Sequence, residues 1–140
     1  MAKLRCSIVT PAESVMDAPV NYVTFEAWDG QRGVESGTSP FLVKLGAGAA
    51  RIDLADGSSK RYAIEGGFAQ MQGGALTLLA DAAILAESID LAAAERDLSA
   101  ANAQVLAANE KPLSLEQREE LERSQRWALS RAALARTVRS

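Results

Sequence analysis

Residues 75–98 read ALTLLADAAILAESIDLAAAERDL, and the spacing of their apolar side chains changes partway along. Before about Glu87 the apolar residues come in short runs, which is typical of strands. After Glu87 they recur about every 3.5 residues, as they do along one face of a helix. We therefore expect an N-terminal β-sandwich over residues 1–87 and a C-terminal α-helical hairpin over residues 88–140.

The first part carries the turn signals of an antiparallel sheet. Its short apolar runs are rich in Val, Ile, Thr, Tyr and Phe, which favour strands. Three pairs tolerate the positive φ that hairpin turns require, namely Asp29-Gly30, Asp56-Gly57 and Gly73-Gly74. Because a single sheet would leave one apolar face in water, this pattern predicts a sandwich or barrel, and we expect an all-β sandwich.

The second part carries the start and stop signals of two helices. Asp90 is the expected N-cap of the first, which ends near Asn109, and Ser114 with Gln117 forms a capping-box pattern for the second. The short connection predicts an antiparallel pair with close axes. Because large apolar side chains are few, we expect the hairpin to be able to detach or rearrange. The expected contact faces are Leu91, Ala94, Leu98, Ala101, Val105 and Ala108 on the first helix, and Leu121, Ala128, Ala132 and Ala135 on the second.

Composition argues against several classes of protein. A formal net charge of −3 over 140 residues is unsuited to general nucleic-acid binding, which needs a basic surface. The sequence has no histidine and one cysteine, Cys6, so the commonest general base and the usual zinc ligands are missing. We expect Cys6 to fill the core, and we expect no catalysis, no metal and no cofactor. No apolar run approaches the roughly 20 residues that span a bilayer.

Several short motifs are spread over nearly the whole chain. They are Ile8-Val9-Thr10-Pro11, residues 29–34 (DGQRGV), residues 37–40 (GTSP), residues 66–70 (GGFAQ), residues 78–83 (LLADAA) and Ile89-Asp90. In order and spacing these motifs resemble one family, the epsilon subunits of bacterial F-type ATP synthases.

The resemblance implies a function without bond chemistry. Members of the family are central-stalk subunits of the rotor of a proton-translocating ATP synthase, in which the sandwich joins the gamma subunit to the c-ring. Their C-terminal helices can inhibit ATP hydrolysis. The implied location is the cytoplasmic side of the bacterial inner membrane, with attachment to the membrane only through the complex.

The resemblance also assigns residues to the side of the sandwich that faces the c-ring. Most members carry His-Ala-Pro where this chain has Thr38-Ser39-Pro40, and Pro-Gly where it has Ala27-Trp28. An acidic residue that is frequent at the position of Gln31 is also missing. The implied c-ring contacts are Gly30, Gln31, Arg32, Gly33, Thr38, Ser39 and Pro40.

Some members bind ATP through an Asp-x-x-Arg-Ala motif on the first helix and two arginines on the second. Here Ala93 occupies the arginine position, and Arg131 and Arg136 are five residues apart rather than four. Alanine cannot replace the bidentate phosphate contact of a guanidinium. We therefore expect little or no nucleotide binding.

Residues 123–140 are strongly basic. They contain five arginines (Arg123, Arg126, Arg131, Arg136 and Arg139) and no acidic residue. These arginines could simply complement the helix macrodipole, and Trp127 could pack on the sandwich. An aromatic and aliphatic stripe beside arginines is, however, typical of a partner surface. The resemblance implies gamma and the acidic C-terminal regions of beta as partners, through Arg123, Arg126, Trp127, Arg131, Leu134 and Val138.

Two other classes of function stay open at the level of sequence. A ligand-binding β-sandwich with a helical appendage would need exposed aromatic side chains that converge on one face. A carboxylate-based hydrolase would need two acidic groups in one cleft. The candidate aromatics are Tyr22, Phe25, Trp28, Phe41, Tyr62 and Phe68, and the candidate acids are Asp17, Glu26, Asp29, Glu35, Asp53, Asp56, Glu65, Asp81 and Glu87.

Overall fold

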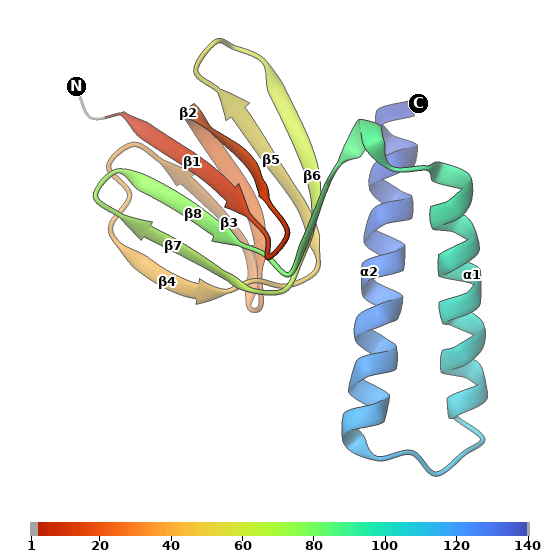
Figure 1. Cartoon of the computed structure of the whole chain (residues 1–140). Coiled ribbons are helices and arrows are strands. Elements are labelled where there is room, and N and C mark those ends of the chain that lie inside the picture. Colours follow the sequence, from red (N-terminus) through yellow and green to blue (C-terminus); the bar gives the residue numbers. More distant parts are fainter. Residues whose placement is uncertain (1–2, 140) are drawn as a thin grey trace. The chain divides into compact units, whose positions relative to one another are not determined.

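The computed structural model describes residues 3–139, with side chains described up to Val138. It divides into two compact units, one that ends at Leu85 and one that begins at Ala86. Over the described residues, the first unit holds nine strands and the second holds two α-helices (Figure 1). The predicted β-sandwich followed by a two-helix hairpin is confirmed.

The strands of residues 3–85 form one continuous path of pairing. The order along the path is β4-β7-β8-β1-β2-β5-β6-β9, and β3 also pairs with β2. All neighbours are antiparallel except β1 and β8, which are parallel. The strands are β1 (Leu4–Val9), β2 (Ser14–Ala27), β3 (Gly30–Glu35), β4 (Phe41–Lys44), β5 (Gly48–Leu54), β6 (Ser59–Glu65), β7 (Phe68–Gln72), β8 (Ala75–Leu79) and β9 (Ala82–Leu85).

The long strand β2 belongs to both layers of the sandwich. Its first half pairs with β1, where Val20 lies opposite Leu4. Its second half pairs with β3 and β5, where Val23 lies opposite both Val34 and Ile52. The path of strands thereby folds back on itself, and the inner faces of the two layers pack together (Figure 1).

The core follows the alternation of side chains along each strand. In β1, Leu4, Cys6 and Ile8 are buried, whereas Arg5 is exposed. Burial raises the pKa of the Cys6 thiol to about 12, so this side chain is an apolar filler rather than a reactive thiol, as predicted. The largest fully buried side chains are Phe25, Leu4, Ile8, Ile52, Leu76, Leu78, Val23, Val34 and Cys6.

The second unit contains a short 3-10 helix, η1 (Ala86–Ser88), followed by α1 (Leu91–Ala108) and α2 (Leu115–Arg139). The predicted N-cap is confirmed, because the Ala93 amide donates a hydrogen bond to Asp90 Oδ1 at 3.2 Å. The capping box is confirmed as well. The Gln117 amide donates to Ser114 Oγ at 3.1 Å, and the Ser114 amide donates to Gln117 Oε1 at 3.0 Å.

The two α-helices pack along small residues and run side by side (Figure 1). The larger side chains predicted for the contact face, such as Leu91, Leu98 and Leu121, are only half-buried. Close axes explain this difference, because short side chains fill the space between helices whose backbones approach each other. The buried alanines are Ala94, Ala101 and Ala108 on α1 and Ala128, Ala132 and Ala135 on α2, and we call them the alanine seam.

The link between β6 and β7 requires glycine. Gly67 has φ +87°, and a Cβ atom there would lie 1.8 Å from the carbonyl oxygen of Leu79. That carbonyl belongs to the backbone, so it cannot move aside without disturbing β8. Gly57, in the turn between β5 and β6, has nearly the same φ of +93°, but a Cβ atom there would meet nothing within 4 Å.

We therefore predict that Gly67→Ala destabilises the protein more than Gly57→Ala does. A positive φ costs a non-glycine residue about 1 to 3 kcal/mol at either position. The clash with Leu79 adds about 1 to 3 kcal/mol at residue 67 alone. Urea unfolding of the full chain would measure both free energies. Equal losses in the two variants would show that the close approach of the two backbones has no energetic effect.

Candidate functional site

The first four residues of β3, directly after the turn from β2, are the first group of predicted c-ring residues. Gly30 pairs with Ala27 where β3 begins, and Gln31 and Gly33 are exposed on the same strand. The hydroxyl of Tyr22 lies over Gly33, where a Cβ atom would otherwise be. The start of β3 therefore presents mainly backbone and one amide side chain to the solvent, and the turn before it exposes Trp28 and Asp29.

Arg32 in this group makes contacts within the sandwich. Its guanidinium carbon lies 5.4 Å from the centre of the Phe41 ring, which is a cation–π distance. One of its terminal nitrogens lies 3.8 Å from a carboxylate oxygen of Asp29. Arg32 therefore ties β3 to the first residue of β4.

The second group of predicted c-ring residues lies where the chain leaves β3. Thr38 closes a turn with Glu35: the Glu35 amide donates to Thr38 Oγ1 at 3.0 Å, and Thr38 Oγ1 donates to the Glu35 carbonyl at 2.7 Å. The Thr38 amide donates to the same carbonyl at 3.1 Å. Ser39 and Pro40 follow and are exposed. The Thr38 hydroxyl thus sets the shape of the segment before β4.

The structure does not bring these two groups together. Gly30 lies opposite Ala27 at one end of β3, and Glu35 lies opposite Tyr22 at the other end. At about 3.3 Å per residue, the two ends of the strand are about 16 Å apart. Any partner that contacts both groups must therefore follow the length of β3.

The sandwich also exposes four large apolar side chains, one in the turn between β2 and β3 and one each on β4, β7 and β8, and we call them the outer apolar surface. Trp28 is 69% exposed, Leu42 66%, Phe68 50% and Leu79 46%. The sequence did not predict that Leu42 and Leu79 lie near the aromatics. Which side chains are neighbours depends on which strands pair, and the sequence pattern of a short strand does not show its partner.

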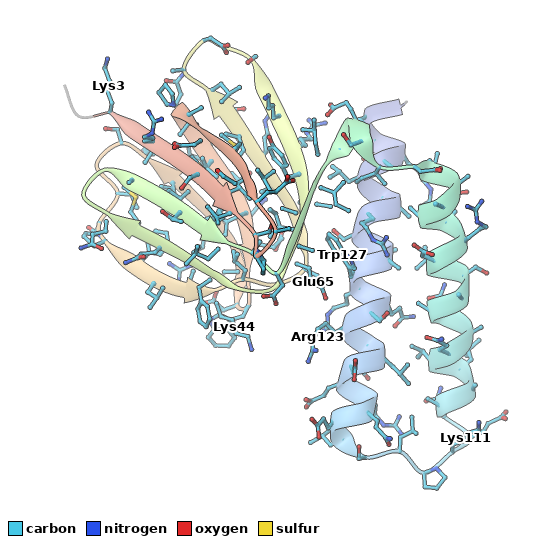
Figure 2. All side chains as sticks on the ribbon, in the orientation of Figure 1. Lys3, Lys44, Glu65, Lys111, Arg123 and Trp127 are labelled. Atoms are coloured by element: carbon cyan, nitrogen blue, oxygen red, sulfur yellow. The ribbon has the colours of Figure 1, made fainter. Side chains whose placement is uncertain are left out.

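Strand pairing places the members of the outer apolar surface next to each other. Phe68 lies directly opposite Leu79 on β8 and opposite Lys44 on β4. Leu42 is two residues before Lys44 and so lies on the same side of β4. The Trp28 amide donates to the Lys44 carbonyl at 2.9 Å. Figure 2 labels Lys44 at the end of β4. Exposed apolar side chains on neighbouring backbone segments are typical of a protein-binding surface.

Of the six candidate aromatics, only Trp28 and Phe68 belong to the outer apolar surface. Phe25 and Tyr62 are buried in the core, and Phe41 is half-buried. Tyr22 is exposed but pairs with Asp53 on β5, in a different part of the sheet from Phe68. No observation therefore favours a ligand-binding sandwich.

The acidic residues likewise give no support to a hydrolase. Hydrogen bonds from Ser59 and Arg51 lower the pKa of Asp53, and hydrogen bonds from Ser58 lower the pKa of Asp56. A catalytic general acid needs a raised pKa instead. Within residues 3–139, no group of three or more metal-ligating side chains is close enough to hold an ion.

In the hairpin, Arg131 contacts both helices. Its guanidinium carbon lies 5.1 Å from the centre of the Trp127 ring, and its Nε donates to the Trp127 carbonyl at 3.4 Å. One of its terminal nitrogens donates to Asp97 Oδ2 on α1 at 3.1 Å. The side chain of Arg131 is only 19% exposed. Arg131 therefore bridges α2 to α1 in a partly desolvated position.

Two further polar pairs join the helices. Arg136 Nε donates to Glu95 Oε1 at 3.1 Å, with both side chains about half exposed. Gln125 Nε2 donates to Asn102 Oδ1 at 2.7 Å. The sequence alone could suggest these α1 partners in one way. If the two helices are assumed to be antiparallel, residues at similar distances from the loop between them lie opposite each other.

The other predicted contacts of α2 are placed differently. Arg123 and Arg126 are exposed, and neither makes an ion pair with any residue that the structure describes. Trp127 and Val138 are half-buried, and Leu134 is buried. Figure 2 shows Arg123 and Trp127 on the side of α2 that faces away from α1. The side chain of Arg139 lies outside the described residues.

None of the described helices is both long enough and apolar enough to cross a membrane.

Comparison with known sequences identifies the first unit. Residues 3–86 match the family model described as "ATP synthase, Delta/Epsilon chain, beta-sandwich domain". The chain is 35% identical over 81 residues to the ATP synthase epsilon chain of Rhodopirellula baltica, covering 58% of this chain and 62% of that relative. It is 39% identical over 88 residues to the epsilon chain of Symbiobacterium thermophilum, covering 62% and 63%. The matches thus span less than two thirds of each relative.

Comparison with solved structures supports the fold. A chain in the mitochondrial ATP synthase of Euglena gracilis, from a structure of OSCP, F1 and the c-ring, superposes with a TM-score of 0.79 at 21% identity. That alignment covers 95% of this chain and 81% of the other. A chain in the central stalk and c-ring of the Tetrahymena thermophila mitochondrial enzyme gives a TM-score of 0.60 at 13% identity, covering 99% and 97%. At these identities the likeness concerns the fold alone.

The ion pairs of Arg131 with Asp97 and of Arg136 with Glu95 lead to a prediction about nucleotide binding. A phosphate group that approached either guanidinium would meet Asp97 or Glu95, and like charges repel it. We predict that the full chain binds ATP with a Kd weaker than about 1 mM, which corresponds to about −4 kcal/mol. Calorimetry would measure this, with Ala93→Arg as the companion variant. A Kd in the micromolar range for the unmodified chain would contradict the prediction.

Proposed function

Because this chain belongs to the ATP synthase delta/epsilon chain family, we propose that it is the non-catalytic epsilon subunit in the central stalk of a proton-translocating F-type ATP synthase. Its sandwich links gamma to the c-ring, and its hairpin can inhibit ATP hydrolysis. The single observation that carries the proposal is the match of residues 3–86, the whole sandwich, to the family model.

The outer apolar surface is the part of the sandwich best suited to bind gamma. It combines the exposed aromatics Trp28 and Phe68 with Leu42 and Leu79. Aromatic side chains that become desolvated contribute most of the energy at many protein interfaces. Lys44 lies beside Phe68 and supplies a charged rim, which is the usual surround of such a centre.

The start of β3 is the proposed contact with the c-ring. This segment exposes Gly30 and Gln31, and the guanidinium of Arg32 contacts the Phe41 ring. Since Thr38, Ser39 and Pro40 lie at the other end of β3, they suit a separate contact with gamma or with a different part of the ring. A subunit that touches two partners needs two such separated contacts on a rigid sheet.

The side of α2 that faces away from α1 is the proposed inhibitory surface. It carries Arg123 and Trp127, and the neighbouring Arg126 is exposed as well. Arg123 and Arg126 have no ion-pair partner among residues 3–138, so they are available to an acidic segment of beta. Long-range attraction would orient the helix, and Trp127 would hold it there.

The proposed location follows from the proposed partners. Through gamma and the c-ring the subunit would lie at the cytoplasmic side of the bacterial inner membrane, as a peripheral component. The described helices offer no membrane span of their own.

Replacing Phe68 in the full chain tests the contact with gamma. We predict that Phe68→Ser weakens binding to the gamma subunit of the same organism by about thirtyfold, because loss of an aromatic anchor costs about 2 kcal/mol. Leu129→Ser is the matched control, since Leu129 is exposed to a similar extent but lies on α2. Titration with purified gamma would measure both affinities. Equal affinities in the two variants would remove the outer apolar surface from the interface.

Truncation tests the inhibitory role of the hairpin. We predict that deletion of residues 111–140 leaves assembly and ATP synthesis largely intact but raises ATP hydrolysis by the reconstituted complex. Trp127→Ala should reproduce part of the rise. Arg126→Ala should do less, because an exposed charge pair contributes only about 0.2 to 1 kcal/mol. Hydrolysis that stays unchanged after truncation, at low and at high salt, would show that this hairpin is not an inhibitor.

A further inference from the structure

The hairpin carries a cavity at the end where α1 and α2 are connected. The cavity has a volume of about 380 Å³ and is open to solvent. Sites for small molecules are typically about 300 to 1,000 Å³ in volume, so a compact ligand fits here. Its walls come from α1, from α2 and from the connection between them, all within the second unit. The lining residues are Gln104, Leu113, Gln117, Glu120, Leu121 and Ser124.

Hydrogen bonds hold the walls of this cavity in place. Gln125, which follows Ser124, donates through Nε2 to Asn102 Oδ1 at 2.7 Å and joins the two helices at this level. The capping box fixes Gln117 to Ser114 through two hydrogen bonds, so the start of α2 is ordered as well. A ligand that enters a preformed cavity pays little for ordering its walls.

The surface of the cavity is partly apolar and partly polar. Leu113 and Leu121 are half-buried and supply the apolar part. The side chains of Gln104, Glu120 and Ser124 are exposed and supply oxygen atoms that accept hydrogen bonds. Glu120 makes no ion pair with any residue that the structure describes. A ligand in the cavity therefore meets an apolar wall next to an unpaired carboxylate.

The chain around the cavity is acidic too. Residues 110–122 contain five acidic and two basic residues, which gives a formal charge of −3. The strongly basic residues 123–139 follow directly, but Arg131 and Arg136 pair with the first half of α1, toward the other end of the hairpin. The local potential at the cavity therefore favours a cation and opposes a phosphate or a carboxylate. The acidic residues of this segment are Glu110, Glu116, Glu119, Glu120 and Glu122.

We propose that this cavity binds a small organic cation, in which a protonated amine is attached to a compact apolar body. The ammonium group donates hydrogen bonds to the Glu120 carboxylate, and the apolar body packs on Leu113 and Leu121. Binding needs only residues of the hairpin and does not depend on the proposed function.

Two ligands of matched shape test the site on the full chain. Phenethylamine is protonated at neutral pH, and phenethyl alcohol has nearly the same shape without the charge. Titrations followed by the NMR shifts of backbone amides give both the Kd and the residues affected. We expect a Kd of about 1 mM for the amine, with the shifts centred on residues 104, 113 and 117–124. The alcohol should bind about threefold more weakly, which is the effect of one exposed ion pair.

Glu120→Gln separates the effect of the carboxylate from that of the apolar wall. In this variant the two ligands should bind equally, because the preference for the amine comes from the charge of Glu120. Glu116→Gln is the matched control and should keep most of the preference, since Glu116 is an exposed acid one turn earlier on α2 that does not line the cavity. Circular dichroism confirms that both variants keep their helices.

Salt gives an independent measurement. Between about 0.01 M and about 1 M salt the screening length falls from about 30 Å to about 3 Å, so binding of the amine should weaken until it matches that of the alcohol. Shifts that do not saturate, shifts centred on the sandwich, equal binding of the two ligands by the unmodified chain, or a preference for the amine that survives Glu120→Gln would each overturn the proposed site.

Discussion

The packing of the two inner faces of the sandwich determines where every outer side chain of the first unit lies. Val23 and Phe25 on β2 are fully buried, and β2 pairs with strands of both layers. Because side chains alternate along a strand, burying Val23 directs Tyr22 and Thr24 outward. A shift of one residue in the strand pairing would expose the buried side chains and bury the outward ones, so burial of the core fixes the register of the sheet. The turns and the outer apolar surface are consequences of that register.

The hairpin follows a different rule from the sandwich. Its helices meet mainly through alanines, so their backbones approach closely, and Leu134 is the one large buried side chain among the described residues of α1 and α2. Close approach brings Arg131 within reach of Asp97 and Arg136 within reach of Glu95. A tightly packed core makes the sandwich a rigid support, whereas a thin seam with exposed ion pairs leaves the hairpin responsive to its surroundings.

Several residues that depart from the family pattern have clear structural roles in this chain. Thr38, where most members carry histidine, closes the turn to Glu35 through its hydroxyl. Trp28, where most members carry glycine, extends the outer apolar surface. Gln31, the second residue of β3, is uncharged where an acidic residue is frequent in the family.

The sequence by itself determined the features that depend on neighbouring residues. The caps at Asp90 and Ser114, the glycine turns and the two-part organisation follow from local spacing, because hydrogen bonds at helix ends and positive φ angles involve residues close in the chain. The family was indicated by the resemblance of short motifs. Only the tertiary structure decided that Phe68 lies between Leu79 and Lys44, and that Arg131 binds Asp97. These partners are distant in sequence. The order of the strands and the register of the two helices bring them together, and the local spacing of residues does not encode either.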